Sequence, residues 1–136
     1  GKIVEMTLRP DDFARVVERA REGRVTICAA EMEVLGCTHA DIGRLLAERW
    51  NLPPKLVNTI AGHHTPTAAG AFAVESSIVH LADILARALQ LGSGGDPTVP
   101  PVDHTAWDLL KLKPASLDDI MAAMLAEFDD ISSFLR

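Results

Sequence analysis

The chain has 136 residues, of which 48% are hydrophobic and 24% charged, a balance that excludes a disordered or fibrous chain. Its formal charge is −6 and its thirteen Lys and Arg residues form no basic stripe, so we expect no nucleic-acid partner. No apolar run approaches the roughly 20 residues of a membrane span, and no basic and apolar leader opens the chain, so we expect a cytoplasmic protein without membrane contact.

The predicted elements are all helices. In chain order we expect them at about 11–23, 25–35, 39–50, 53–64, 74–91, 107–110 and 117–128. Pro10 precedes the first, Gly23 and Gly36 end the first and second, and Thr38 is a good N-cap for the third. No stretch alternates apolar and polar residues as a half-buried strand would. We therefore predict an all-α fold, a compact bundle of about six or seven helices that forms a single domain over 1–136.

Two segments interrupt the helical pattern. Residues 65–72 are small and flexible in character, and residues 93–101, which are rich in Gly and Pro, form the clearest loop. Asp103 and His104 could cap the short helix after that loop. Ser116 is the expected N-cap of the last helix.

A few histidines and one aspartate could carry chemistry. His39 lies at the start of the third predicted helix, His63 and His64 lie at the end of the fourth, and Asp83 lies within the apolar fifth helix. Imidazole and carboxylate groups are the usual ligands of iron, manganese or zinc at a hydrolytic site. A bare carboxylate in the apolar run around Asp83 would be costly to bury, which implies a partner.

Structural roles are the alternative for each of these residues taken alone. The helix dipole and the free carbonyl groups of a helix C-terminus favour a histidine at the position of His63 or His64. His39 could simply occupy the first turn of its helix, and Asp83 could pair with an arginine or with a helix N-terminus. His80 lies three residues before Asp83 on the same helical face, which favours a local hydrogen bond or a surface position over metal ligation.

Four short motifs occur in order along the chain: EVLGCTHADIG at 33–43, WNLP at 50–53, IAGHH at 60–64 and IVHLAD at 78–83. Their order and spacing together resemble the HDOD domains, which are relatives of the HD and HD-GYP metal-dependent phosphohydrolases. The opening Gly1-Lys2-Ile3-Val4 resembles the residues directly after the His-Asp pair of that superfamily in an HD-x-Gly-Lys motif. The resemblance therefore implies that the chain is the C-terminal part of a larger domain or protein and starts just after that pair.

The resemblance also implies a candidate site. In metal-binding members of the superfamily, the positions that match His39, His63, His64 and Asp83 are ligands, and Lys2 would lie near the phosphate of a substrate. Without the His-Asp pair, the remaining ligands could hold one divalent ion, iron, manganese or zinc, and would leave a two-metal clamp incomplete. No Gly-Tyr-Pro triplet comes after the two histidines, so we do not expect hydrolysis of cyclic dinucleotides.

Three functions remain open at this point. The first is a bacterial signal-transduction module that is not itself an enzyme and that contacts other signalling domains or proteins, or a small ligand. The second is a metal-dependent phosphohydrolase that acts on a phosphate ester or nucleotide. The third is a helical interaction domain whose histidines are incidental. The last helix, with Phe134 and Leu135 near its end, could dock on a second copy of the chain, so a homodimer is a further expectation.

The two cysteines, Cys28 and Cys37, form no CxxC pair and lack the spacing of a zinc knuckle. We interpret both as reduced thiols of a cytoplasmic protein. The sequence alone assigns neither of them a role in the candidate site.

Overall fold

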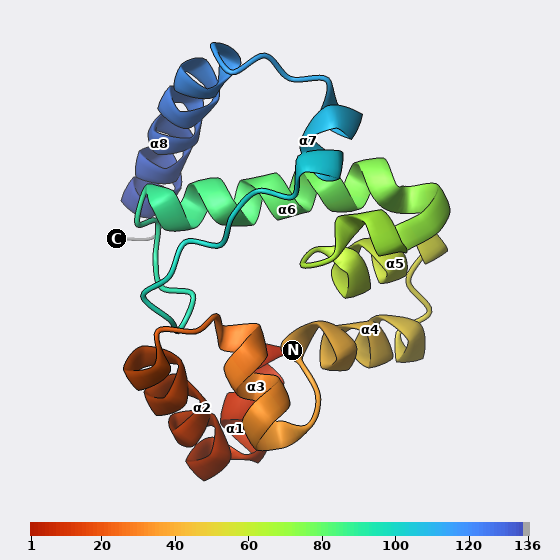
Figure 1. Ribbon diagram of the computed structural model, residues 1–136, viewed down its shortest axis with the longest axis vertical. Coiled ribbons are helices and arrows are strands. Elements are labelled where there is room, and N and C mark those ends of the chain that lie inside the picture. Colours follow the sequence, from red (N-terminus) through yellow and green to blue (C-terminus); the bar gives the residue numbers. More distant parts are fainter. Residues whose placement is uncertain (135–136) are drawn as a thin grey trace.

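A computed structural model describes residues 1–134, apart from the side chains of Ser132 and Phe134. Its elements are α1 (Lys2–Leu8), α2 (Pro10–Gly23), α3 (Ile27–Leu35), α4 (His39–Arg49), α5 (Pro54–Gly62), the 3₁₀ helix η1 (Pro66–Phe72), α6 (Ala73–Ala88), α7 (His104–Leu110) and α8 (Ser116–Phe134). No strand occurs in this range, which confirms the all-α prediction (Figure 1). The expected docking role of Phe134 and Leu135 falls outside the side chains that the structure describes.

Several helix ends agree with the signals of the sequence. The Thr38 hydroxyl accepts a hydrogen bond from the backbone N–H of Asp41, and the Asp41 carboxylate accepts one from the backbone N–H of Thr38. This capping box satisfies two backbone donors and fixes the residue at which α4 begins. Gly36 has a φ of 74°, the left-handed conformation that ends α3. Because α3 ends at Gly36 and Thr38 caps α4, His39 is fixed as the first residue of α4.

Other boundaries differ from the prediction. Residues 66–72, expected to be flexible, form the 3₁₀ helix η1, which Gly70 kinks with a φ of 57°. Helix α6 ends at Ala88, before the predicted residue 91, because Gln90 adopts a left-handed φ of 56°. Asp103 caps α7, whereas His104, which was expected to share that role, is the first helical residue. Ser116, the predicted N-cap of the last helix, is the first residue of α8.

The helices form two groups. We call α1, α2 and α3 the N-terminal lobe and α4 to α8 the C-terminal lobe. In Figure 1 the first lies at the bottom, α4 lies to its right, and the rest of the second lies above them. Helices α2 and α3 pack on each other around a small apolar core, Val16, Ala20, Ile27 and Ala30. In the second lobe α4 packs on α5, and α6 packs on α5, η1 and α7. The candidate site lies where the two lobes meet.

The loop after α6 ties the lobes together. It runs from the end of α6 down to α2 and α3 and then back up to α7 (Figure 1). The fully buried carboxylate of Asp96 accepts hydrogen bonds from the backbone N–H of Ile27 at 2.8 Å and from Arg87 Nη1 at 2.9 Å. It also accepts two from Thr98, through N and Oγ1. Asp96 thereby connects the first residue of α3 to α6.

The stretch Pro66–Ala88, which joins η1 and α6, is long and apolar enough to cross a membrane by length and composition alone, with a mean hydropathy of 1.4. It carries polar contacts within the fold, however. His80 bonds to backbone groups on both sides, and Arg87 reaches Asp83 and Asp96. Helices that pack inside a folded domain often have this apolar character.

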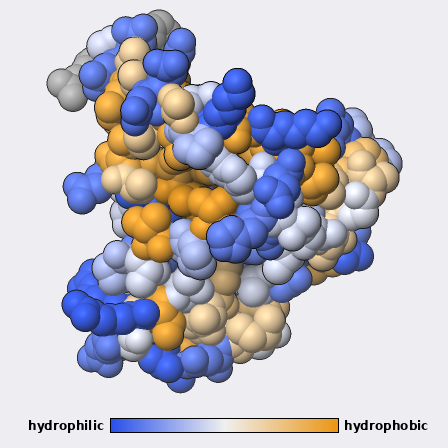
Figure 2. Space-filling view, turned by 45° about the horizontal axis from the view of Figure 1, so that its top comes forward, coloured by the Kyte–Doolittle hydropathy of each residue, from blue (hydrophilic) through white to orange (hydrophobic). Residues whose placement is uncertain are grey.

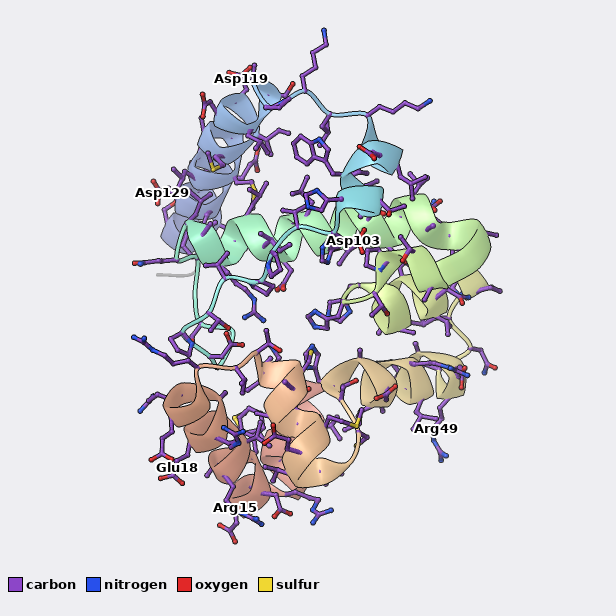
Figure 3. All side chains as sticks on the ribbon, viewed as in Figure 1. Arg15, Glu18, Arg49, Asp103, Asp119 and Asp129 are labelled. Atoms are coloured by element: carbon purple, nitrogen blue, oxygen red, sulfur yellow. The ribbon has the colours of Figure 1, made fainter. Side chains whose placement is uncertain are left out.

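Helix α8 is loosely attached and borders an apolar groove of about 570 Å³. The groove is lined by Val74, Ile78, Leu81, Ala82, Leu85, Leu109, Leu110, Leu112, Ile120 and Met124. Figure 2 shows apolar residues gathered beside α8. Charged side chains labelled in Figure 3, such as Arg15, Arg49 and Asp129, point away from the middle of the molecule.

Candidate metal centre

Three of the predicted ligands meet between the lobes. His39 is the first residue of α4, His63 is the C-cap of α5 and His64 comes directly after it. The Nε2 atom of His39 lies 2.9 Å from Nε2 of His64 and 3.4 Å from Nε2 of His63. Nε2 of His39 therefore lies close to a ring nitrogen of each of the other two histidines.

A glycine lets the histidine pair approach α6. A Cβ atom on Gly62 would lie 3.0 Å from the Cβ of Ala69 and 3.3 Å from Oγ of Ser76, which is tighter than ordinary packing. The close contact of the end of α5 with η1 and α6 thus favours a residue without a side chain at position 62, since a Cβ there would push its neighbours back. His63 and His64 take their positions from this close contact.

Glu31 orients His39. Both carboxylate oxygens of Glu31 lie 2.8 Å from Nδ1 of His39, and the backbone N–H of His39 donates to Oε2 at 2.9 Å. An ionised carboxylate only accepts, so Nδ1 carries the proton and Nε2 keeps a free lone pair. This carboxylate–imidazole arrangement is the one that typically supports a metal-binding histidine. Glu31 was missed by the sequence analysis, although an acid in the apolar run 25–35 presents the same signal that singled out Asp83.

A second set of bonds orients His63. Its Nδ1 donates to the backbone carbonyl of Ile60 at 2.7 Å, which also leaves Nε2 with a free lone pair. Nδ1 of His80 donates to the backbone carbonyl of His63 at 2.9 Å, and Nε2 of His80 accepts from the backbone N–H of Asp103 at 3.1 Å. Figure 3 shows Asp103 where the loop meets α7. His80 is thus a buried residue with hydrogen bonds to two backbone groups; of the two roles that the sequence offered, a hydrogen bond and a surface position, the structure contradicts the second.

Burial keeps the cluster neutral. It lowers the pKa of His39 and of His64 to about 3, and the positive charges of Lys2 and of the other histidines act in the same direction. Burial also lowers the pKa of His63. Neutral imidazole is the form that binds a metal ion.

The distances fit one ion. At about 2.0–2.1 Å from the metal, tetrahedral ligand nitrogens lie roughly 3.3 Å apart, and neighbouring octahedral ones roughly 3.0 Å apart. The nitrogen separations of 2.9 and 3.4 Å are close to these values. In the described part of the chain, donor atoms of Cys28, His39 and His64 also lie within 4.8 Å of one another. Cys28 is a neighbour that the sequence analysis did not connect with the site, because its approach depends on how α3 packs.

The other two predicted site residues are engaged elsewhere. The carboxylate of Asp83 accepts a hydrogen bond from Arg87 Nε at 3.1 Å, which is the arginine pair that the sequence left open. The Asp83 side chain is 34% exposed, and its negative charge raises the pKa of all three clustered histidines against the effect of burial. Lys2 Nζ donates to the backbone carbonyl of Gly94 at 2.8 Å.

A buried acid lies behind Glu31. The side chain of Glu5 comes from α1, is 3% exposed, and neither of its carboxylate oxygens has a hydrogen-bond partner. Burial, together with the negative charge of Glu31, raises the pKa of Glu5 to about 7. Burial likewise raises the pKa of the Cys28 thiol to about 12, with a further contribution from Glu31.

A cavity of about 430 Å³ adjoins the cluster. It is lined by Thr26, Ile27, Cys28, His64, Thr65, His80, Arg87, Pro100, Pro101, Val102 and Asp103. The cavity therefore joins one side of His64 to the segment after α6, and it is large enough for a small ligand.

The fold and the clustered helix-end histidines agree with the class of protein that the motifs indicated, an all-α domain of the HD type. The HDOD domain family model matches residues 1–66, which agrees with the resemblance that the motifs indicated. The matched range contains Lys2, His39, His63 and His64 and ends before Asp83. An uncharacterized protein of Treponema pallidum (strain Nichols) is 33% identical over 64 residues, which is 47% of this chain and 12% of that protein. The chain thus spans about an eighth of that relative's length, and no solved structure matches it significantly.

Proposed function

We propose that the chain is a regulatory HDOD-type module of a cytoplasmic signalling protein, which binds one divalent metal ion in the histidine cluster and does not itself turn over a substrate. The observation that supports this best is the cluster of three neutral imidazoles around Nε2 of His39, with His39 and His63 held by backbone and carboxylate partners. Such an ion would be a Lewis acid bound chiefly by nitrogen, of the iron, manganese or zinc type.

The placement of the remaining groups supports the regulatory part of the proposal. Hydrolysis of a phosphate ester needs a cation near the phosphate oxygens and a group that handles a proton. Lys2 Nζ is bound to the Gly94 carbonyl, and the guanidinium of Arg87 is bound to the carboxylates of Asp83 and Asp96. The cations nearest to the cluster therefore hold the loop and α6 in place.

The test combines metal binding with hydrolysis. The metal-free chain is titrated with zinc, manganese and iron(II), and bis(p-nitrophenyl) phosphate is offered to each loaded form. We expect one ion per chain, no binding in the His63→Ala, His64→Ala double variant, and no hydrolysis above the rate of the free ion. Absence of binding would refute the metal site. Hydrolysis that disappears in the double variant would refute the regulatory part.

A metal-dependent phosphohydrolase is the second candidate function, because of the cavity beside His64. A substrate in that cavity would lie against His64, with Thr65 and Asp103 at its walls. The same hydrolysis assay decides between the two functions. An enzyme would show saturable turnover that a bulky substitution in the cavity wall, such as Thr65→Leu, weakens by raising KM.

The apolar groove supports contact with a partner, including a second copy of this chain. Ile120 and Met124 of α8 line the groove, and Leu125, Phe128 and Ile131 of the same helix are 42%, 41% and 57% exposed. Large exposed apolar areas are typical of interaction surfaces. Light scattering on the chain and on a Phe128→Asp variant tests the homodimer: a dimer that dissociates in the variant supports it, and a monomeric wild type refutes it.

A further inference from the structure

Cys28 reaches the histidine cluster from the other lobe. It is the second residue of α3, is half-buried and forms no disulfide. Its Sγ lies 4.0 Å from Nδ1 of His39, and the donor atoms of Cys28, His39 and His64 all lie within 4.8 Å of one another. The cluster therefore has a sulfur donor at its N-terminal edge as well as three nitrogens.

The sulfur is close to bonding distance. In a tetrahedral site with a metal–sulfur bond of about 2.3 Å, the sulfur lies roughly 3.6 Å from each ligand nitrogen. Nε2 of His39 has suitable spacings to Nε2 of His63 and of His64, and Sγ lies within 4.8 Å of the donor nitrogens of His39 and His64. To reach this distance, Sγ has to move toward them by about an ångström. A change in the single χ1 torsion of Cys28 can produce a movement of this size.

We propose that Cys28 is the fourth protein ligand of the ion and that the site is therefore a zinc-type Cys-His₃ site. This inference rests on the proposed binding of a metal by the three histidines and adds the donor that selects the metal. Thiolate favours zinc over the harder manganese and magnesium ions. On binding, the thiol proton of Cys28 is released to solvent and the sulfur bonds to the ion.

The fourth ligand has two consequences for the module. Four protein donors complete a tetrahedral shell and leave no open coordination position for a substrate, as in structural zinc sites. The ion would also connect α3 to α4 and α5, and so add to the links that Asp96 and Glu31 already make between the lobes. Zinc would thereby stabilise one arrangement of the two lobes.

Cobalt(II) is the probe, because it occupies zinc sites and its complexes absorb light. The metal-free chain, a Cys28→Ser variant and a Cys37→Ser control are titrated with cobalt(II), and near-ultraviolet and visible spectra are recorded. Cys37 is the matched control because it is the other cysteine and lies outside the donor group. We expect a thiolate-to-cobalt charge-transfer band in the wild type and in Cys37→Ser, and its loss in Cys28→Ser together with at least tenfold weaker binding.

The outcomes separate this inference from the proposal on which it rests. Cobalt binding without a charge-transfer band, or a band that persists in Cys28→Ser, overturns the role of Cys28 and leaves the histidine site intact. No binding to the wild type overturns both. Circular dichroism of the Cys28→Ser variant shows whether its helices are retained, and a folded variant that keeps wild-type zinc affinity also overturns the inference.

Discussion

The Glu31 carboxylate of the N-terminal lobe binds both the backbone N–H and the imidazole ring of His39 in the C-terminal lobe. The two carboxylate oxygens lie 2.8 Å from Nδ1, and the backbone N–H at the start of α4 donates to the same carboxylate. The first N–H groups of a helix have no partner within the helix, so this contact satisfies a donor that would otherwise be buried alone. One carboxylate thus fixes both the helix start and the direction of the ring.

A Glu31→Gln substitution should weaken metal binding. The amide cannot match the charge of the carboxylate, so His39 becomes a poorer and less well oriented ligand, and we expect the zinc affinity to fall by about 10- to 100-fold. Competition with a chromogenic chelator measures it. Glu33→Gln is the control, because Glu33 forms an exposed ion pair with Arg19 and should leave the affinity unchanged. An equal loss in both variants would contradict the role of Glu31.

A Glu5→Gln substitution should change how stability depends on pH. The pKa of Glu5 is about 7 in the folded chain and near 4.5 when unfolded, so the folded state binds the proton more tightly. The stability that this provides is complete below pH 4.5 and is lost as the pH rises through 7. Glutamine cannot ionise, and we expect it to raise the free energy of unfolding at pH 8, relative to pH 5, by about 1–3 kcal/mol.

Urea unfolding of the metal-free chain and of Glu5→Gln at the two pH values measures this difference. The buried histidines contribute to both proteins, so their effect cancels in the comparison. Identical pH dependence in the two proteins would show that Glu5 titrates normally.

An Asp96→Ala substitution should strongly destabilise the fold. It removes the acceptor of Ile27 and Thr98 and one of the two carboxylates that bind Arg87, whose side chain is only 8% exposed. Loss of a buried charged partner costs about 3–5 kcal/mol, which urea unfolding can measure. Asp129→Ala on the exposed face of α8 is the control and should change the free energy of unfolding by less than about 0.5 kcal/mol. A small effect at Asp96 would mean that the loop does not tie the lobes.

A Thr38→Ala substitution should destabilise the start of α4. Loss of the capping box removes the hydroxyl that accepts from Asp41 N, and an N-cap of this kind contributes about 1 kcal/mol. Thermal unfolding measures the change. Thr7→Ala in α1 is the control, because the Thr7 hydroxyl bonds to the carbonyl of Ile3 on the helix surface and alanine favours the helix interior. Equal melting temperatures for wild type and Thr38→Ala would contradict the capping role.

The features of the fold that depend on residues close together in the sequence could be predicted. Thr38 as the cap of α4, Gly36 as the end of α3 and the all-helical class all come from local signals, and the structure contains them. The short helix α1 and the kinked helix η1 were harder to predict, because a helix of one or two turns depends on packing more than on the helix propensity of its residues. In its described part the chain has eight α-helices, one more than the seven predicted ranges because of α1, and the 3₁₀ helix η1 in addition.

The candidate site could be predicted only in part. The motifs placed His39, His63 and His64 at helix ends, and the structure brings them together. Contacts between lobes were not visible in the sequence, because Glu31 meets His39 only after α3 and α4 pack. The ion pair of Asp83 with Arg87 was foreseeable, since residues four apart on a helix face one another.

His80 connects the pair His63 and His64 to helix α7 through two hydrogen bonds. One nitrogen of its rigid ring donates to the carbonyl of His63. The other accepts from the backbone N–H of Asp103, the N-cap of α7. A displacement of the end of α5 must therefore either carry α7 with it or break a buried hydrogen bond, at about 1–3 kcal/mol for the group left without a partner. A movement of the histidine pair would therefore act on α7, whose Leu109 and Leu110 line the apolar groove.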